Sequence, residues 1–292
     1  MKASAFDYAR VASIHHALEM LSLHGEQAKL LSGGQSLLPA MNLRLVSPQI
    51  LIDIGDLAEL RGIAVDSDVL RIGALTRHVE LLTSHLVAAH APLLSDAVKH
   101  IAHPAIRNRG TLGGSLAHAD PAAELPACML ALNATIIACG RDGERRIAAA
   151  EFFQGIYATA LRPDELLAAV ELPIARQNSV DFFQEFARRH GDYALAGVAA
   201  RASVASGGFS KLRMAFFAIA DRPVLANAAA KLLNVAITPE LIADASVAFG
   251  NELNPPEDQQ ASSSMRRHLA SVLFRRCVEA LLARGRLYGG AG

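Results

Sequence analysis

The chain has 292 residues, of which 52% are hydrophobic and 19% charged, and its 28 basic and 28 acidic side chains give a formal net charge of zero. This balance is typical of an ordered globular protein and excludes an intrinsically disordered chain. The charges form no blocks, which argues against a nucleic-acid-binding surface and against a polybasic membrane patch. The length favours two or three compact units.

The first half of the chain alternates helical and extended patterns. Residues 11–24 place apolar side chains at helical spacing, and Ser13 is a plausible N-cap. A short strand at 29–31 enters a glycine-rich loop, and alternating isoleucines in 50–54 predict a second strand. Further expected elements are a strand at 69–77, helices at 77–100 and 122–132, and a hairpin at 134–152 that turns at Asp142-Gly143.

The character of the sequence changes near residues 175–179. Beyond them, 180–189 and 193–220 have the pattern of antiparallel strands, with a turn at Ser206-Gly207-Gly208, and helical patterns continue to the end. We therefore expect a domain boundary between residues 177 and 178.

The three cysteines, Cys128, Cys139 and Cys277, are too few and too scattered for a disulfide framework, and no Cys-x-x-Cys pair is present to bind zinc or an iron–sulfur cluster. We expect them to be reduced, buried and inert. The first residues lack the continuous apolar segment of a signal peptide, and no apolar run is long enough to span a bilayer as a helix. The sequence therefore predicts a cytoplasmic protein without stable membrane insertion.

The stretch SGGQSL lies between an apolar run and a helix-like segment. Glycines permit positive φ and a close approach to the backbone, so its amides could converge on an anion, with two serine hydroxyls as further donors. The spacing matches neither the P-loop nor the Gly-x-Gly-x-x-Gly turn of nicotinamide-binding folds. Taken alone, a Gly-Gly pair before a helix is more often an ordinary turn. The residues of this predicted cradle are Ser32, Gly33, Gly34, Gln35, Ser36 and Leu37.

A second loop, RGTLGGSLAHAD at 109–120, repeats this chemistry. Thr111 and Ser115 supply hydroxyls, while Gly113 and Gly114 let backbone amides come close to a ligand. Two such loops suit the two phosphates of one dinucleotide.

Three segments, SGGQSLLPAMNLR, HPAIRNRGTLGGSLAHADPAAELPA and ARRHGDYALAGVAA, resemble the FAD-binding medium subunits of the molybdenum hydroxylases. This family includes carbon monoxide dehydrogenase, quinoline and nicotine oxidoreductases, and the flavin domain of xanthine dehydrogenase. The resemblance covers nearly the whole chain, and residue 32 is Ser where the family usually has Ala. It implies an α+β fold: a two-subdomain FAD-binding domain of the p-cresol methylhydroxylase type at 1–177 (subdomains about 1–56 and 57–177), and a smaller α/β C-terminal domain at 178–292.

The resemblance also implies roles for individual residues. The two glycine loops would hold the pyrophosphate and ribityl region of noncovalently bound FAD, mostly through backbone amides. Ile101 and Leu161 would flank the adenine ring, and Glu124 would accept hydrogen bonds from the ribityl hydroxyls. Tyr193 would pack near the isoalloxazine ring and shield its reactive edge. From the residues alone, ordinary core positions are the more frequent role for residues such as Ile101 and Leu161, and the alternative for Tyr193 is a strand tyrosine at a core edge.

Several neighbouring polar residues have simpler explanations. Asp120 precedes a proline at a helix start, so N-capping is its expected role. His103 and His118 are expected to be structural hydrogen-bonding residues, and Arg188 and Arg189 to lie on a solvated or partner-facing surface. We identify no catalytic residue and no metal ligand in the sequence.

Finally, the resemblance implies a subunit of a larger complex. An iron–sulfur small subunit with two [2Fe–2S] clusters and a large subunit with molybdopterin cytosine dinucleotide would complete a heterotrimer or its dimer. The substrate, an N-heteroaromatic compound or carbon monoxide, would react in the large subunit, and electrons would pass through the clusters to FAD and then to an external acceptor. Two alternatives remain: a self-sufficient FAD-dependent oxidase or reductase, and a non-catalytic flavin-binding assembly protein.

Overall fold

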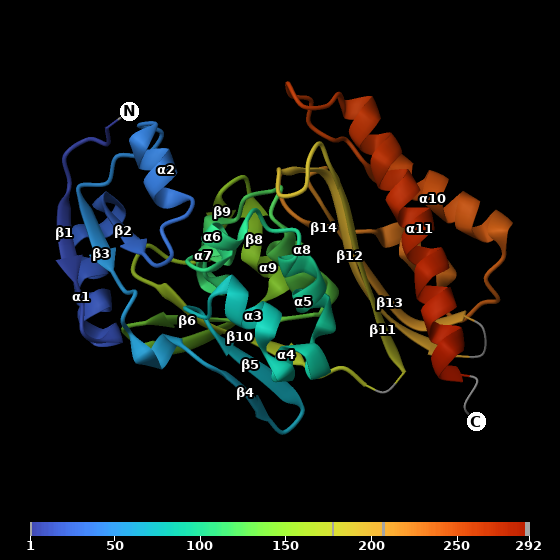
Figure 1. Cartoon of the computed structure of the whole chain (residues 1–292), viewed down its shortest axis with the longest axis horizontal. Coiled ribbons are helices and arrows are strands. Elements are labelled where there is room, and N and C mark those ends of the chain that lie inside the picture. The colour runs from blue at the N-terminus through green and yellow to red at the C-terminus, as the bar shows by residue number, and fades with distance from the viewer. Residues whose placement is uncertain (1, 177, 206–207, 290–292) are drawn as a thin grey trace.

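The computed structural model describes residues 2–176, 178–205 and 208–289. Sheets of three, five and four strands follow one another along the chain, and a small two-stranded sheet lies beside the central one (Figure 1). The first two positions of the turn expected at Ser206-Gly207-Gly208 lie outside the described residues, and Gly208 begins a strand.

The first sheet is parallel, with the order β1-β3-β2. Helix α1 begins after its predicted cap, because the Ser13 hydroxyl accepts a hydrogen bond from the His16 amide at 3.1 Å. Strand β2 leads directly into the first glycine loop, and α2 follows that loop. The predicted helix and both predicted strands are therefore confirmed. The elements are β1 (Asp7–Arg10), α1 (Ile14–His24), β2 (Ala28–Leu31), α2 (Leu37–Asn42) and β3 (Ile50–Asp53).

The second sheet is antiparallel, with the order β4-β5-β10-β6-β7. The predicted hairpin is confirmed as β6 and β7, and Gly143 adopts the positive φ of 110° that its turn requires. The strands are β4 (Ile63–Asp66), β5 (Val69–Gly73), β6 (Thr135–Gly140), β7 (Gly143–Ala148) and β10 (Leu166–Pro173).

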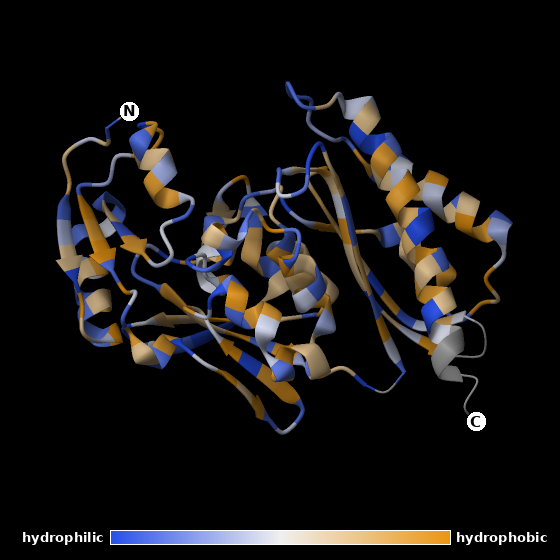
Figure 2. Ribbon diagram, in the orientation of Figure 1, coloured by the Kyte–Doolittle hydropathy of each residue, from blue (hydrophilic) through white to orange (hydrophobic). Residues whose placement is uncertain are grey.

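Strand β6 shows why this sheet is central. Ile136 and Ala138 pack into the core beneath the helices, whereas Ile137 packs toward the first sheet. Because successive side chains of a strand point to opposite faces, the continuous apolar run of β6 serves two cores at once. The orange strands in the centre of Figure 2 belong to this sheet.

Short helices cover one face of the second sheet. The helical region expected at 77–100 is three helices, because the Ser84 hydroxyl caps a new one and Pro92 begins another. The helices are α3 (His78–Thr83), α4 (His85–His90), α5 (Pro92–Val98), α6 (Pro104–Arg107), α7 (Leu112–His118), α8 (Glu124–Ala131) and α9 (Ala149–Phe152).

Two expectations near this region need correction. Asp120 is not the N-cap of α8: the helix begins at Glu124 after Ala123, and the Asp120 carboxylate accepts a hydrogen bond from the Ala122 amide at 2.8 Å within the preceding turn. Cys139 is also not fully buried, because it lies at the end of β6, whereas the other two cysteines are buried.

The third sheet is antiparallel, with the order β11-β12-β13-β14, and α10 and α11 pack on one of its faces (Figure 1). Its other face shares a core with the helices of the central region, since Ala199, Ala215 and Phe217 belong to the cluster that contains α8. The elements are β11 (Ser179–Ala187), β12 (Ala194–Ala205), β13 (Gly208–Phe217), β14 (Val224–Leu225), α10 (Pro239–Glu252) and α11 (Ser263–Gly289).

The remaining elements are short. No helix in the described part of the chain is long and apolar enough to cross a membrane. The short elements are the 3₁₀ turns η1 (Gly25–Gln27), η2 (Ala58–Leu60) and η3 (Asn227–Leu232), and the strands β8 (Phe153–Gly155) and β9 (Ala158–Thr159).

Candidate functional site

The two glycine loops, 79 residues apart along the chain, lie against each other. The hydroxyl oxygens of Ser32 and Thr111 are 3.1 Å apart and hydrogen-bonded. A Cβ atom on Gly114 would lie 2.7 Å from the Thr111 hydroxyl and 2.9 Å from the Ser32 hydroxyl. A Cβ atom on Gly33 would lie 2.3 Å from the carbonyl oxygen of Arg109. The glycines therefore permit an approach of the two backbones that side chains would prevent.

The first loop leaves its amides free. Gly34 adopts φ of 72°, and among the described residues no acceptor is found for the N–H groups of Gly34, Gln35 and Ser36. The Gln35 side chain instead donates to the Gly33 carbonyl at 2.8 Å, which braces the loop internally. Three unpaired donors in consecutive residues form the kind of concavity that binds phosphate. Ser36 is exposed and Leu37 is half-buried at the start of α2.

The second loop is different, because its amides are already used by the protein. This loop therefore offers fewer free amides than the first one, and the Thr111 hydroxyl is already bonded to the Gly114 amide and to the Ser32 hydroxyl. Binding of a ligand by the backbone amides of this loop stays a prediction. Gly113 is buried and packs closely against Ala74. The amide pairs are Leu112 to the Thr76 carbonyl (2.9 Å), Gly113 to the Ala74 carbonyl (2.8 Å), Gly114 to the Thr111 hydroxyl (3.1 Å) and Ser115 to the Thr111 carbonyl (3.0 Å).

His78 supports the second loop, and no pattern in the sequence singled it out. Its ring Nε2 lies 3.1 Å from the Thr111 carbonyl, and its backbone amide donates to the Gly110 carbonyl at 2.9 Å. Burial lowers the pKa of His78 to about 4, so the ring is neutral at pH 7. A neutral ring facing a carbonyl must carry its proton on Nε2, and the buried Nδ1 has no partner among the described residues.

Glu124 lies in the first turn of α8 and is half-buried. Burial, followed by the negative charge of Glu185, raises the pKa of Glu124 to about 8. The side chain is therefore mostly protonated at pH 7. A protonated carboxyl can donate a hydrogen bond as well as accept one, which differs from the carboxylate acceptor expected from the sequence.

The remaining predicted site residues are Ile101, Leu161 and Tyr193. Ile101 is buried in the central core, and Leu161 is partly buried against the same core. Tyr193 precedes β12 and 71% of its surface is exposed. Partial burial, followed by the charge of Asp120 and the proximity of Tyr157 and Glu124, raises the pKa of Tyr193, which places the tyrosine near the start of α8.

Several polar residues lie near the loops, and the structural role expected of His103 and His118 stays a prediction. The His118 and Tyr157 rings are 4.8 Å apart, and Arg188 and Arg189 are exposed. Arg107 is half-buried, and its guanidinium donates to the Ile101 and Ala102 carbonyls at 2.8 and 3.0 Å. Arg107 therefore fixes the backbone of the segment that carries Ile101.

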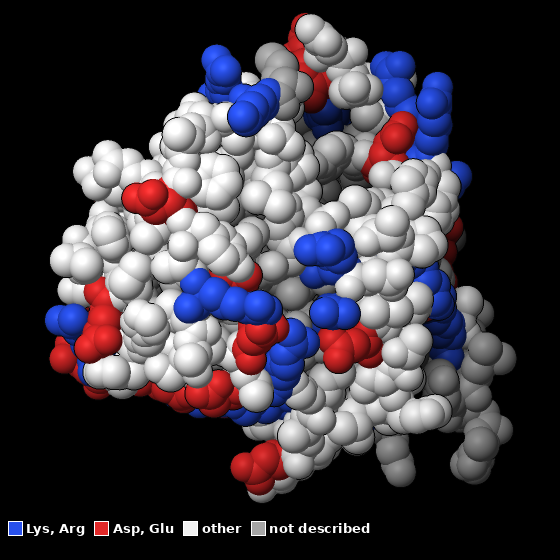
Figure 3. All heavy atoms as spheres, turned by 60° about the vertical axis from the view of Figure 1, so that its left-hand side comes forward, with Lys and Arg blue, Asp and Glu red and all other residues white. Residues whose placement is uncertain are grey.

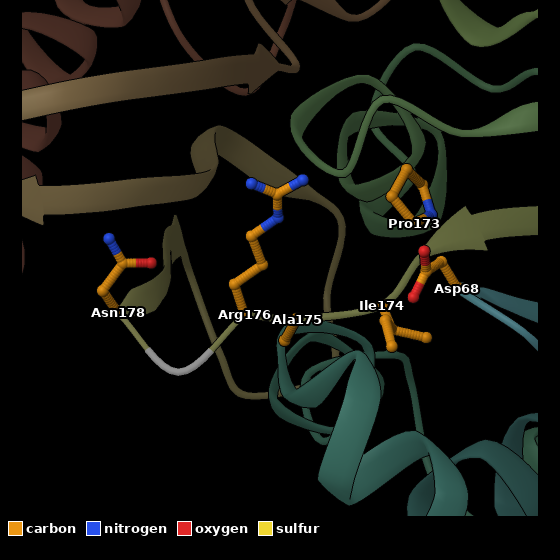
Figure 4. A pocket seen from close by; sticks show the side chains of 6 residues that line it. All are labelled: Asp68, Pro173, Ile174, Ala175, Arg176 and Asn178. Atoms are coloured by element: carbon orange, nitrogen blue, oxygen red, sulfur yellow. The ribbon is translucent and has the colours of Figure 1, made fainter.

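A separate hollow of about 650 Å³ lies where the chain leaves β10 (Figure 4). Its described lining comes from the turn after β4, from the last residue of β10 and from the connection to β11, and includes none of the predicted site residues. The lining residues are Asp68, Pro173, Ile174, Ala175, Arg176 and Asn178.

The charge on the surface agrees with the composition. Figure 3 shows acidic and basic side chains scattered over one face, with wide uncharged areas between them. This face offers no single-sign field that would attract a polyanion such as nucleic acid.

Comparison with known proteins extends the resemblance over the whole chain. Residues 4–175 match the family model described as the FAD binding domain in molybdopterin dehydrogenase, and residues 181–281 match the CO dehydrogenase flavoprotein C-terminal domain. The chain therefore belongs to the family of FAD-binding medium subunits of molybdenum hydroxylases, whose members are subunits of oxidoreductases. The fold class and family predicted from the sequence are confirmed.

Individual relatives match from end to end. The nicotine 6-hydroxylase medium subunit of Paenarthrobacter nicotinovorans is 40% identical over 95% of this chain and 98% of its own. The 6-hydroxypseudooxynicotine dehydrogenase complex subunit alpha of the same organism is 38% identical over 98% and 97%. The solved structure of carbon monoxide dehydrogenase from Hydrogenophaga pseudoflava aligns with a TM-score of 0.95 at 36% identity, over 97% of this chain and 99% of that one.

Proposed function

We propose that this chain is the electron-transfer subunit of a molybdenum hydroxylase complex, with noncovalent FAD held between the two glycine loops. The observation that carries the proposal is the meeting of the loops at Ser32, Thr111 and Gly114, because a dinucleotide needs two adjacent phosphate sites. The free amides of the first loop supply donors there. FAD, when bound, supplies the ability to accept electrons singly and release them in pairs.

In this proposal, different residues bind different parts of FAD. Ser32 to Leu37, with Thr111, Gly114 and Ser115, hold the phosphates and the adjoining ribityl chain, and Gly113 lets the second loop pack closely enough to do so. Ile101 and Leu161 flank the adenine ring, and Glu124 binds ribityl hydroxyls. Tyr193 covers the flavin ring and controls access of the acceptor, because it is exposed beside Glu124.

We also propose the partners and the substrate class. An iron–sulfur subunit with [2Fe–2S] clusters would deliver electrons from a large subunit with molybdopterin cytosine dinucleotide, in a heterotrimer or its dimer. An N-heteroaromatic substrate is favoured over carbon monoxide, because the nicotine enzymes are slightly more similar to this chain than the carbon monoxide dehydrogenase is. The proposed location is the cytoplasm.

The domain division at 177/178, with a subdomain boundary near 56, remains our proposal. It is supported by the separation of the three sheets along the chain and by the two family models, which meet between 175 and 181.

The first test is FAD uptake followed by reconstitution. The apoprotein should acquire a yellow flavin spectrum that acid precipitation releases, since no covalent link is proposed. Photoreduced flavoprotein should pass electrons to an acceptor, yet the isolated chain should not oxidise substrate until both partner subunits are added. A chain that stays colourless in excess FAD would overturn the proposal, and substrate turnover without partners would favour the self-sufficient flavoenzyme. A chain that binds FAD but exchanges no electrons even within the complex would favour the assembly protein.

Two variants distinguish residues that bind FAD from the residue that controls access of the acceptor to the flavin. Gly114→Ala places a Cβ against the two hydroxyls where the loops meet, so FAD occupancy should fall sharply while the fold remains. Tyr193→Ala removes an exposed ring, so occupancy should persist while the rate of flavin reoxidation by dioxygen or a quinone changes. Equal loss of FAD in both variants would contradict the assigned roles.

A further inference from the structure

Residues 188–195, which we call the Tyr193 loop, connect β11 to β12 and contact the FAD-binding domain. Gly191 in this loop adopts a positive φ of 86°. A Cβ atom on Gly191 would lie only 2.9 Å from the carbonyl oxygen of Ala102. The loop backbone is therefore packed against the segment that directly follows Ile101, at a distance that only glycine allows.

Arg266 fixes the C-terminal end of the Tyr193 loop. It lies near the start of α11, and its side chain is only 6% exposed. Its Nη1 donates to the carbonyls of Leu195 and Ala218, both at 2.8 Å, and its Nη2 donates to the Asp258 carboxylate at 2.7 Å. A guanidinium is costly to bury, and its planar donors offset this cost when several acceptors match them. Arg266 is therefore a rigid connection between α11 and the end of the loop.

The same arginine also reaches the start of α8 through Ala218. Ala218 follows β13 with a φ of 62°, and its amide donates to the Pro121 carbonyl at 2.8 Å. Pro121 lies in the turn before α8, three residues before Glu124. One buried side chain therefore contacts both the Tyr193 loop and the residue that holds this turn.

Arg188 fixes the N-terminal end of the loop to the same part of the chain. Its guanidinium donates to the Gln260 carbonyl at 2.8 Å. Asp258 shapes this turn, because its Oδ1 accepts the Gln260 amide at 2.8 Å while its Oδ2 accepts from Arg266. The start of α11 and the turn before it (residues 258–262) thus lie beside the loop at one end of the third sheet and hold both of its ends (Figure 1).

The Tyr193 side chain has little packing of its own, because 71% of its surface is exposed. The place of its ring is therefore set by the backbone on either side of it. A side chain that must lie against a cofactor is held by the residues that support it, and here those residues are the two arginines.

We propose that Arg188 and Arg266 are positioning residues of the flavin site: they hold the Tyr193 loop at both ends and so place the Tyr193 ring over the flavin. The inference rests on the proposed function, because it takes Tyr193 as the cover of the flavin ring. It gives the C-terminal domain a role in controlling the access of the electron acceptor.

The first measurement is hydrogen–deuterium exchange of the peptide that covers residues 188–195, in the protein without FAD. Arg188→Ala should speed exchange there about fivefold, the factor that corresponds to one net hydrogen bond. Arg266→Lys should speed it by about tenfold or more, because one ammonium cannot reproduce planar donors that reach two carbonyls and a carboxylate. Arg189→Ala is the matched control, since Arg189 is exposed on the same loop and its side chain makes no hydrogen bond among the described residues. It should leave the exchange unchanged.

The second measurement tests whether the loop acts through Tyr193. With FAD bound and photoreduced, Arg188→Ala should move the rate of flavin reoxidation by a quinone toward that of Tyr193→Ala, while the dissociation constant of FAD stays the same. In a Tyr193→Ala background, Arg188→Ala should have no further effect, because the ring that the loop positions is absent. A merely structural role would give the same shift in both backgrounds.

The outcomes distinguish this inference from the proposed function. If Arg266→Lys does not fold, Asp258→Asn, at a half-exposed acid, should speed exchange of the loop by less. Exchange that the Arg188 and Arg266 variants leave unchanged, or a shift in reoxidation that persists without Tyr193, overturns the inference while FAD binding stands. Wild type that binds no FAD overturns the proposed function and this inference with it.

Discussion

The two glycine loops look alike in sequence, but the structure supports them in opposite ways. The first loop is half-buried, contains the positive φ of Gly34 and leaves consecutive amides without partners. The second loop packs against Ala74 and His78, and its amides at residues 112–115 donate to acceptors within the protein. The same Gly-Gly pair therefore provides a flexible backbone with free donors in one loop, and room for close packing in the other.

Gly113→Ala tests the packing role and should give the largest effect. A Cβ atom there would lie 2.5 Å from the Ala74 Cβ and 2.9 Å from the Ala74 carbonyl oxygen, so the backbone itself would have to move. We expect a loss of about 3 kcal/mol in the free energy of unfolding, measured by urea denaturation. Gly114→Ala is the matched control, because its Cβ would meet only side-chain hydroxyls. Equal stability of the two variants would contradict the difference between these neighbouring glycines.

The contribution of His78 to the stability of the folded protein should depend on pH. Its pKa in the folded protein, about 4, lies below the unfolded value of 6.5, so between these values the unfolded state binds more protons. The stabilisation is complete above pH 6.5 and is lost as the pH falls toward 4, by up to about 3 kcal/mol. The difference in unfolding free energy between wild type and His78→Asn should therefore shrink on acidification. A difference that stays constant with pH would show that His78 is not buried in neutral form.

Gly34→Ala tests the conformational role in the first loop. Its φ of 72° is unfavourable for alanine, and the new Cβ would lie 3.0 Å from the Leu38 side chain. The expected loss is about 1 to 2 kcal/mol, smaller than at Gly113 because a flexible side chain can move aside. Repeating the substitution in a Leu38→Ala background should leave most of the loss in place. If the loss disappears there, crowding is the cause and not backbone strain.

Ser32→Ala should give the smallest effect. It removes the hydrogen bond to the Thr111 hydroxyl at the contact of the loops, which contributes about 1 kcal/mol or less. Thr111→Ala should cost more, about 1 to 2 kcal/mol, because Thr111 also caps α7 through the Gly114 amide. Thermal unfolding of both variants and of wild type measures the two losses of stability. A larger loss in Ser32→Ala than in Thr111→Ala would contradict the structural role assigned to the Thr111 hydroxyl.

The sequence by itself determined the elements and the family of this protein. Ser13 predicted the start of α1, the isoleucines of β3 predicted a strand, and the two glycine motifs indicated a dinucleotide, because caps, side-chain alternation and glycine placement are local properties of the chain. The resemblance to the medium subunits then implied that this dinucleotide is FAD. The sequence also predicted antiparallel strands after residues 175–179, and β11, β12 and β13 lie there.

Only the tertiary structure decided how the site is held. Asp120 could have capped a helix, but the turn before α8 uses its carboxylate instead. The support of Thr111 by His78, and the contact of Glu185 with His100, join residues far apart in the chain and depend on burial that no local pattern records. Burial is a property of the packed domains together, and it sets the protonation of Glu124 and His78 through the loss of water around each group.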